Sequence, residues 1–232
     1  MLYIFTQRDP FFIDTFIYKF DEFGVEYVLF NFPNFNKGIR YGIKRSIQLY
    51  GILGFFKLLF IFLSEKPFRK IKNAKKILNI SKLSDIEPYL SEITDDDIVL
   101  SLSAPTRIPV EKMPKKSLKI NFHCGKLPEY SGMMPIFWQV YNKEKNIIIT
   151  AHNMSEKIDE GKIILEREVK IEGSFFNLSR KAKSISAELF KEIIDNRKSF
   201  SQSNLQDRKD LKLNKFPKKN EIKKIKEIIK LI

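Results

Sequence analysis

The sequence is poor in the residues that hold metals or disulfides. It has one cysteine, Cys124, and two histidines in 232 residues. A single cysteine cannot form a disulfide within the chain, and so few ligands predict no bound metal. The first ten residues, MLYIFTQRDP, lack the basic lead and apolar run of a secretory signal. These absences favour a reducing compartment, and we expect the protein to be cytoplasmic.

Acidic residues are also scarce relative to basic ones. The chain has 28 Asp and Glu against 42 Lys and Arg, which gives a formal net charge of +14. Such an excess suggests an anionic partner: nucleic acid, a membrane surface or a phosphorylated small molecule. The sequence is rich in Lys, Ile, Asn and Phe, a composition that an A+T-rich coding sequence also produces. Charge alone leaves both explanations open.

The order of apolar runs and amphipathic stretches predicts an α/β fold. Residues 2–6 and 26–30 have the pattern of buried strands, and residues 11–23 between them have that of a helix. This alternation predicts a Rossmann-like, mainly parallel sheet flanked by helices. Further strands are expected at 98–102, 118–122, 147–153 and 163–169, and a long helix at 175–195.

Composition divides the chain into a main domain, residues 1–196, and a basic C-terminal appendage, residues 197–232. Ile222, Ile225, Ile229 and Ile232 recur in the appendage at helical spacing. The appendage either packs on the main domain or adds basic surface to a binding site, and the sequence does not separate these alternatives. We find no internal repeat.

Residues 49–63 form a long apolar run. The run is shorter than the roughly 20 residues of a membrane-spanning helix, and it contains Gly51 and Gly54. Lys44 and Arg45 precede it, so a helix lying on anionic lipid is one alternative. We predict instead a buried helix on one face of the sheet and no membrane partner.

The segment KINFHCGKLPEYSG, residues 119–132, contains the candidate chemistry. Asn121 and His123 are two residues apart at the end of a predicted strand, so both side chains leave the same face. An amide can donate to an oxyanion that forms on a carbonyl, while an imidazole moves a proton. Cys124 must point to the other face, which predicts a packing role for it. His152, on the next strand, is expected to be a buried structural histidine.

A longer ordered set of motifs follows this pair. NFHCGKLPEYSGMMPIFWQV and TAHNMSEKIDEGKIIL resemble the formyltetrahydrofolate-dependent formyltransferases, most of all the sugar-nucleotide N-formyltransferases. The resemblance covers roughly residues 98–170. Its elements are an Asn-x-His strand, a Leu-Pro loop, a Gly-x-x-Pro turn and an Asp-x-Gly, here Asn121 and His123, Leu127 and Pro128, Gly132 and Pro135, and Asp159 and Gly161.

The resemblance implies a direct transfer in which N10-formyltetrahydrofolate is the formyl donor. By this resemblance Asn121 stabilises the tetrahedral intermediate, His123 assists proton transfer, and Asp159 orients the histidine and helps to remove the amine proton. Relatives often have Pro or Ser after the histidine and Arg before the loop glycine, where this chain has Cys124 and Ser131. The residues expected to contact the folate are Thr106, Arg107, Ile108, Pro109 and Ile158.

Three acceptors are known in the family: initiator methionyl-tRNA, glycinamide ribonucleotide and amino sugars linked to a nucleoside diphosphate. The tRNA enzymes usually carry a C-terminal barrel, for which the roughly 35 residues after Arg197 are too few. The purine enzymes usually have a glycine-rich phosphate loop after the first strand, where this chain has TQRDPFF. We therefore expect a nucleotide-linked amino sugar as the acceptor, and no nucleic acid.

Arg8, at the end of the first predicted strand, is the candidate for a substrate contact, with a solvated loop charge as the alternative. The exposed edges of an open sheet make a homodimer a candidate assembly. A non-catalytic module that binds anions on the same fold is the rival from another functional class. The resemblance also implies a role in O-antigen or other surface polysaccharide synthesis.

Overall fold

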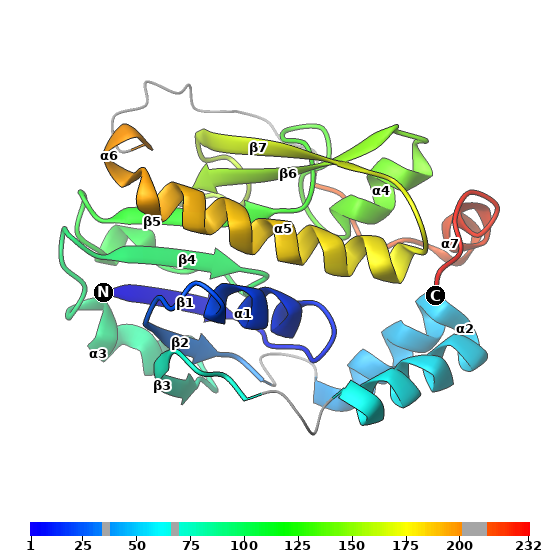
Figure 1. Cartoon of the computed structure of the whole chain (residues 1–232), viewed down its shortest axis with the longest axis horizontal. Coiled ribbons are helices and arrows are strands. Elements are labelled where there is room, and N and C mark those ends of the chain that lie inside the picture. The colour runs from blue at the N-terminus through cyan, green and yellow to red at the C-terminus, as the bar shows by residue number, and fades with distance from the viewer. Residues whose placement is uncertain (34–37, 66–69, 201–212) are drawn as a thin grey trace.

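The computed structural model describes residues 1–33, 38–65, 70–200 and 213–232. In these residues one seven-stranded sheet has the order β3-β2-β1-β4-β5-β6-β7 (Figure 1). Strands β3 to β5 in this order run parallel, and β6 and β7 pair antiparallel. The predicted mainly parallel sheet is confirmed. The strands are β1 (Leu2–Thr6), β2 (Tyr27–Asn31), β3 (Ala74–Asn79), β4 (Ile98–Leu102), β5 (Leu118–His123), β6 (Asn146–Asn153) and β7 (Ile163–Lys170).

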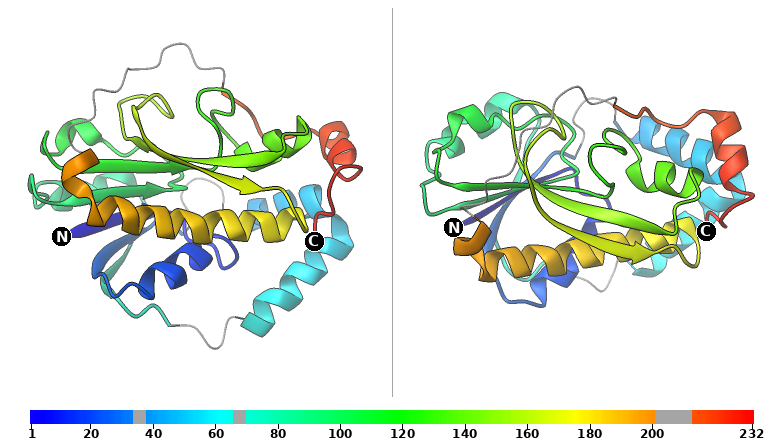
Figure 2. Two further views of the ribbon diagram at one scale, coloured as in Figure 1. Left: turned by 45° about the horizontal axis from the view of Figure 1, so that its top comes forward. Right: turned by 90° about the horizontal axis from the view of Figure 1, so that it is seen from above.

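Helices α1 (Ile13–Asp21) and α5 (Phe175–Asp195) cover one face of the sheet side by side (Figures 1 and 2). Phe20 of α1 packs on Phe190 of α5 with ring centroids 5.2 Å apart. The long helix predicted at 175–195 is therefore confirmed, and its apolar stripe faces the sheet. A second apolar cluster on the opposite face includes residues of η2 (Leu83–Ile86) and α3 (Glu87–Leu90) and lies close to the 3-10 turn η3 (Val110–Lys112).

The alternation along β5 decides which side chains are available for chemistry. Ile120 and Phe122 point into the cluster under α1 and α5. Because side chains alternate along a strand, Asn121 and His123 point to the opposite face. In the parallel register Asn121 lies beside Ser101 of β4. Asn121 and His123 therefore emerge together, as the sequence predicts.

Helix α2 (Gly38–Glu65) is not the buried helix predicted for residues 49–63. In the described part of this helix only Leu49 and Leu58 are buried, and most of its other apolar side chains are partly or largely exposed. The prediction was wrong because α1 and α5 already occupy that face of the sheet. Helix α2 lies beyond the end of the sheet, next to α7 (Lys219–Ile225) (Figures 1 and 2).

The described part of the appendage packs on the main domain. Ile222, Ile225 and Ile229 are buried in the same cluster as α1 and α5, and α7 lies against α4 (Pro135–Tyr141). The backbone N–H of Phe175 donates to the Lys230 carbonyl at 2.7 Å. Residues 213–232 therefore share one core with the sheet. The short helix α6 (Arg197–Phe200) follows α5.

Candidate active site

A cavity of about 1040 Å³ opens at the carboxyl ends of β1, β4 and β5. The chain reverses its direction of sheet growth between β1 and β4, and α/β folds bind ligands at such a point. Gln7 follows β1 in the wall, Ser103 follows β4, and Asn121 and His123 end β5. Thus the topology brings residues distant in sequence to one edge.

Asn121 is held in place by a histidine of the neighbouring strand. The two residues are register partners across β5 and β6, and Asn121 Nδ2 donates to His152 Nε2 at 2.9 Å. His152 Nδ1 in turn donates to the Asn153 carbonyl at 2.9 Å, which fixes the tautomer that leaves Nε2 as an acceptor. Buried His152 therefore orients the Asn121 amide. The sequence predicted its burial but not this positioning role.

His123 is buried and contacts two groups. Its Nε2 donates to the Tyr130 carbonyl at 2.8 Å, and its Nδ1 lies 3.5 Å from Asp159 Oδ1. Burial lowers the pKa of His123 below its ordinary value, and the nearby Asp159 opposes that shift. The neutral ring then carries its proton on Nε2, so Nδ1 is free to accept one. Asp159 is placed to stabilise the charged ring.

Asp159 comes from a loop, not from a strand, and backbone geometry places it. Its φ is +60°, and its Oδ2 accepts from the Gly132 N–H at 2.8 Å. Gly132 has a φ of +92°, and a Cβ there would lie 2.6 Å from the Asn214 carbonyl oxygen. At Gly161 a Cβ would lie 1.6 Å from the Asn153 carbonyl oxygen. Both motif glycines are therefore required for the loop to close on the site.

Most of the residues predicted to contact folate line the same cavity. Thr106, Arg107, Ile108 and Ile158 do so, whereas the described lining does not include Pro109. Arg107 makes a two-pronged ion pair with Glu111, with both N–O distances 2.9 Å. Three large apolar side chains that remain exposed in the described residues also line the cavity, namely Met133, Ile158 and Leu213.

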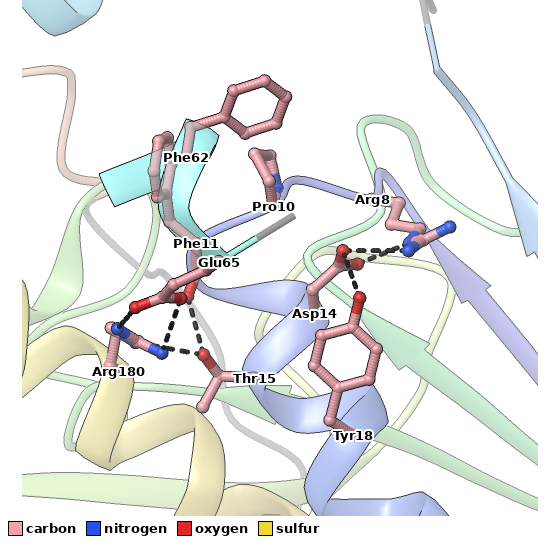
Figure 3. A pocket seen from close by; sticks show the side chains of 9 residues that line it. All are labelled: Arg8, Pro10, Phe11, Asp14, Thr15, Tyr18, Phe62, Glu65 and Arg180. Atoms are coloured by element: carbon pink, nitrogen blue, oxygen red, sulfur yellow. Dashed lines mark hydrogen bonds and ion pairs between the residues drawn. The ribbon is translucent and has the colours of Figure 1, made fainter. Parts of the chain in front are cut away.

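Arg8 is not brought to this cavity. It lines a separate pocket of about 230 Å³, where its guanidinium pairs with Asp14 and Nη2 donates to Oδ2 at 2.9 Å (Figure 3). Tyr18 Oη donates to the same carboxylate at 3.4 Å. The ion pair accounts for Arg8 without a substrate, so the predicted substrate contact gains no support from its position.

Several cavity residues escaped the sequence analysis. Lys183 of α5 is buried, and its Nζ donates to Ser103 Oγ at 3.0 Å. The sequence pattern that could have revealed Lys183 is a lysine on the apolar face of an amphipathic helix. Arg45 of α2 also lines the wall, with its guanidinium 4.0 Å from the Phe216 ring centroid. The segment 213–216 of the appendage completes the rim, so this segment both packs and adds to the site.

No protein-family model matches the chain. Among characterised proteins, a methionyl-tRNA formyltransferase from Thermodesulfovibrio yellowstonii is 33% identical over 118 residues, which are 50% of this chain and 36% of that protein. A GDP-perosamine N-formyltransferase from Brucella melitensis is 31% identical over 80 residues, 34% of this chain and 30% of that protein. The chain thus spans about a third of the length of these relatives.

Solved structures resemble the chain over more of its length. A 4-N formyltransferase from Francisella tularensis superposes with a TM-score of 0.58 at 20% identity, covering 92% of this chain and 75% of that one. An N-formyltransferase from Helicobacter canadensis, solved with folinic acid and dTDP-3-aminofucose, superposes with a TM-score of 0.57 at 18% identity. The superposition covers 89% of this chain and 67% of that one. The chain therefore has the formyltransferase fold and resembles the folate-dependent formyltransferases, as predicted.

Proposed function

We propose that this chain transfers the formyl group of N10-formyltetrahydrofolate to the amine of a nucleoside-diphosphate-linked amino sugar. The observation that carries the proposal is the pair of hydrogen-bonded units at the end of β5. Asn121 is oriented by His152, and His123 lies beside Asp159, within one cavity. This arrangement supplies an amide donor and a proton acceptor around a single point.

The cavity fits a donor and an acceptor bound side by side. Its volume of about 1040 Å³ is slightly above the range of about 300–1,000 Å³ for small-molecule pockets. The exposed side chains of Ile158 and Met133 offer an apolar wall for a planar ring system. Thr106, Arg107 and Ile108 supply the adjoining wall. These features suit a reduced folate, which supplies the one-carbon group when bound.

The two hydrogen-bonded units divide the proton and charge chemistry. The attacking amine must lose a proton, and the folate nitrogen must gain one as the bond between carbon and nitrogen breaks. His123 Nδ1 takes the amine proton and passes it to the leaving folate nitrogen, and Asp159 stabilises the charged imidazole between these two steps. The Asn121 amide has a second N–H, which donates to the carbonyl oxygen as negative charge develops there. His152 keeps that amide in position.

The charge around the cavity favours a phosphorylated acceptor. Lys183, Arg45 and Lys215 line it, and a diphosphate would be neutralised between such groups. The amides at the start of α1 are already used: Asp9 accepts from the N–H groups of Phe11 and Phe12 at 2.9 and 2.7 Å. A carboxylate there excludes a phosphate from that helix terminus, which counts against glycinamide ribonucleotide as the acceptor.

The sugar N-formyltransferases among the similar structures support an amino sugar as the acceptor. We further propose a dTDP-4-amino-4,6-dideoxyhexose as the sugar nucleotide and a cytoplasmic role in O-antigen or other surface polysaccharide synthesis. These finer assignments rest on the resemblance alone. We also propose that the protein assembles as a homodimer.

The test is a direct assay of the purified chain. It is incubated with N10-formyltetrahydrofolate and a panel of aminated sugar nucleotides, with charged initiator tRNA and glycinamide ribonucleotide as competing acceptors. Mass spectrometry should find one formyl group added to a sugar nucleotide. If only the tRNA or only the ribonucleotide were formylated, that molecule would be the acceptor and the proposed amino sugar would be wrong. Folate binding without transfer to any acceptor would contradict the enzymatic proposal.

A further inference from the structure

Helix α2 exposes a long apolar surface, which we call the α2 stripe. Within residues 40–65 the mean hydropathy reaches 1.9 in an 18-residue window, of which only 11% is buried. Leu53 and Phe60 are 81% and 73% exposed. Contiguous apolar surface of this kind marks an interaction site. The stripe consists of Ile43, Ile47, Ile52, Leu53, Phe56, Leu59, Phe60 and Leu63.

The geometry of α2 does not suit a membrane-spanning helix. Gly51 has φ 78° and ψ 175°, so the helix is broken there into two straight parts. Each part has 13 or 14 residues and is therefore about 20 Å long at about 1.5 Å per residue. The hydrocarbon core of a bilayer is about 30 Å thick, so neither part crosses it. The stripe is suited to lying along a surface.

Contacts with the protein body fix which side of α2 faces outward. Glu65 at the end of the helix accepts two hydrogen bonds from Arg180 of α5 at 2.8 and 3.1 Å, and Phe62 meets Phe11 edge to face (Figure 3). Leu58 is buried on the same side. At the other end Arg45 stacks on Phe216. The α2 stripe is thus presented by a helix that is anchored at both ends.

Basic side chains lie on α2 and on the segment beside it. Arg40, Lys44 and Lys57 are exposed on α2 itself. The C-terminal segment 213–232, with seven lysines and two glutamates, lies beside α2 (Figures 1 and 2). A Cβ on Gly54 would lie 3.3 Å from Ile232 Cδ1, which confirms the contact. An apolar strip with a cationic rim is the pattern of a helix that binds anionic lipid at the membrane interface.

We propose that the α2 stripe and the lysines of residues 218–230 dock the protein on the surface of an anionic phospholipid bilayer. A second copy of the chain is disfavoured as the occupant, because a symmetric interface would bring these cationic rims together. This inference departs from the expectation of no membrane partner, which depended on a buried helix at 49–63. It stands independently of the formyl transfer proposed above.

The experiment measures sedimentation of the full chain with vesicles of phosphatidylglycerol and phosphatidylcholine, and with phosphatidylcholine alone. Binding should require the anionic lipid and fall steeply with salt. The triple variant L53Q/F56Q/F60Q should lower the partition coefficient about tenfold or more, because it removes exposed apolar area that the bilayer would cover. Ile77→Gln, at an exposed apolar residue of β3, is the matched control and should bind as the wild type does.

A second pair of variants tests whether the lysines contribute to vesicle binding. K223E/K226E, in the segment beside α2, should lower binding about tenfold. K115E/K116E changes the net charge equally at exposed residues of the loop before β5 and should have little effect. The proposal is overturned if the wild type does not sediment with anionic vesicles, or binds pure phosphatidylcholine equally well. It is also overturned if ultracentrifugation finds a dimer that the triple variant dissociates.

Discussion

The cavity at β5 and the α2 stripe both expose apolar side chains, but their surroundings differ. In the cavity Ile158 and Met133 adjoin a network in which Asn121, His123 and Asp159 have named hydrogen-bond or ion-pair partners. On α2 the exposed apolar side chains adjoin lysines and arginines. Apolar surface beside a fixed polar network suits a small ligand. Apolar surface beside exposed cationic side chains suits an extended anionic surface.

The two regions also differ in how tightly the backbone is packed. Gly132 and Gly161 approach other backbone atoms so closely that no side chain fits. At Gly42 and Gly51 of α2 there is nothing within 4 Å of an added Cβ. The backbone around the cavity is therefore tightly packed at both motif glycines, whereas α2 has open space at Gly42. The following variants test this difference.

The largest effect is expected at His123. His123→Asn removes the proton acceptor beside Asp159 and should lower turnover about 10²–10⁴-fold. Ile77→Gln lies on β3, outside both regions, and should leave turnover unchanged. Steady-state rates with the sugar nucleotide measure both. If the His123 variant kept most of its activity, the cavity would not be the catalytic site that we propose.

A pair of glycine variants compares the backbones directly. Gly161→Ala should destabilise the fold by about 3 kcal/mol or more, because its Cβ overlaps the Asn153 carbonyl. Gly42→Ala lies on the exposed side of α2 in open space and should stabilise the protein by up to about 1 kcal/mol. Urea unfolding of both variants gives the two free energies. Equal effects would mean that the regions are equally constrained.

The two sides of α2 should respond unequally as well. Leu58→Ala opens a buried site and should cost about 2 kcal/mol, at the low end for such changes because a surface helix can relax. Phe60→Ala, at an exposed residue two positions away, should change the unfolding free energy by less than about 0.5 kcal/mol. A large loss of unfolding free energy in Phe60→Ala would show that the protein itself covers the α2 stripe.

The sequence predicted six of the seven strands of the sheet, missing β3, and it predicted part of the site. The bounds predicted for β1, β4 and α5 match the structure, since their apolar periodicity is strong. Asn121 and His123 followed from strand alternation, whereas Asp159 required the resemblance, because a loop with positive φ carries it to the site. The helix at 49–63 was misplaced because apolar content indicates what a helix prefers to contact, not whether a sheet face remains to receive it.

The smallest expected effect separates the regions by pH. Burial lowers the pKa of His123, so its neutral form should persist below the ordinary value of about 6.5, and kcat/KM should fall only under more acidic conditions. Below about 6.5 the unfolded chain binds a proton that the folded chain excludes, so stability falls with falling pH in that range. His123→Gln should flatten this slope in urea unfolding.

Vesicle binding should not follow the same profile, because both histidines of the chain, His123 and His152, lie in the cavity and none lies in the α2 stripe. As the pH falls below about 6.5, the ordinary pKa of histidine, the partition coefficient on anionic vesicles should stay nearly constant, while kcat/KM falls once His123 becomes protonated. If the partition coefficient and the activity declined together, a titrating group of the cavity would affect membrane binding by α2. The two regions would then be coupled.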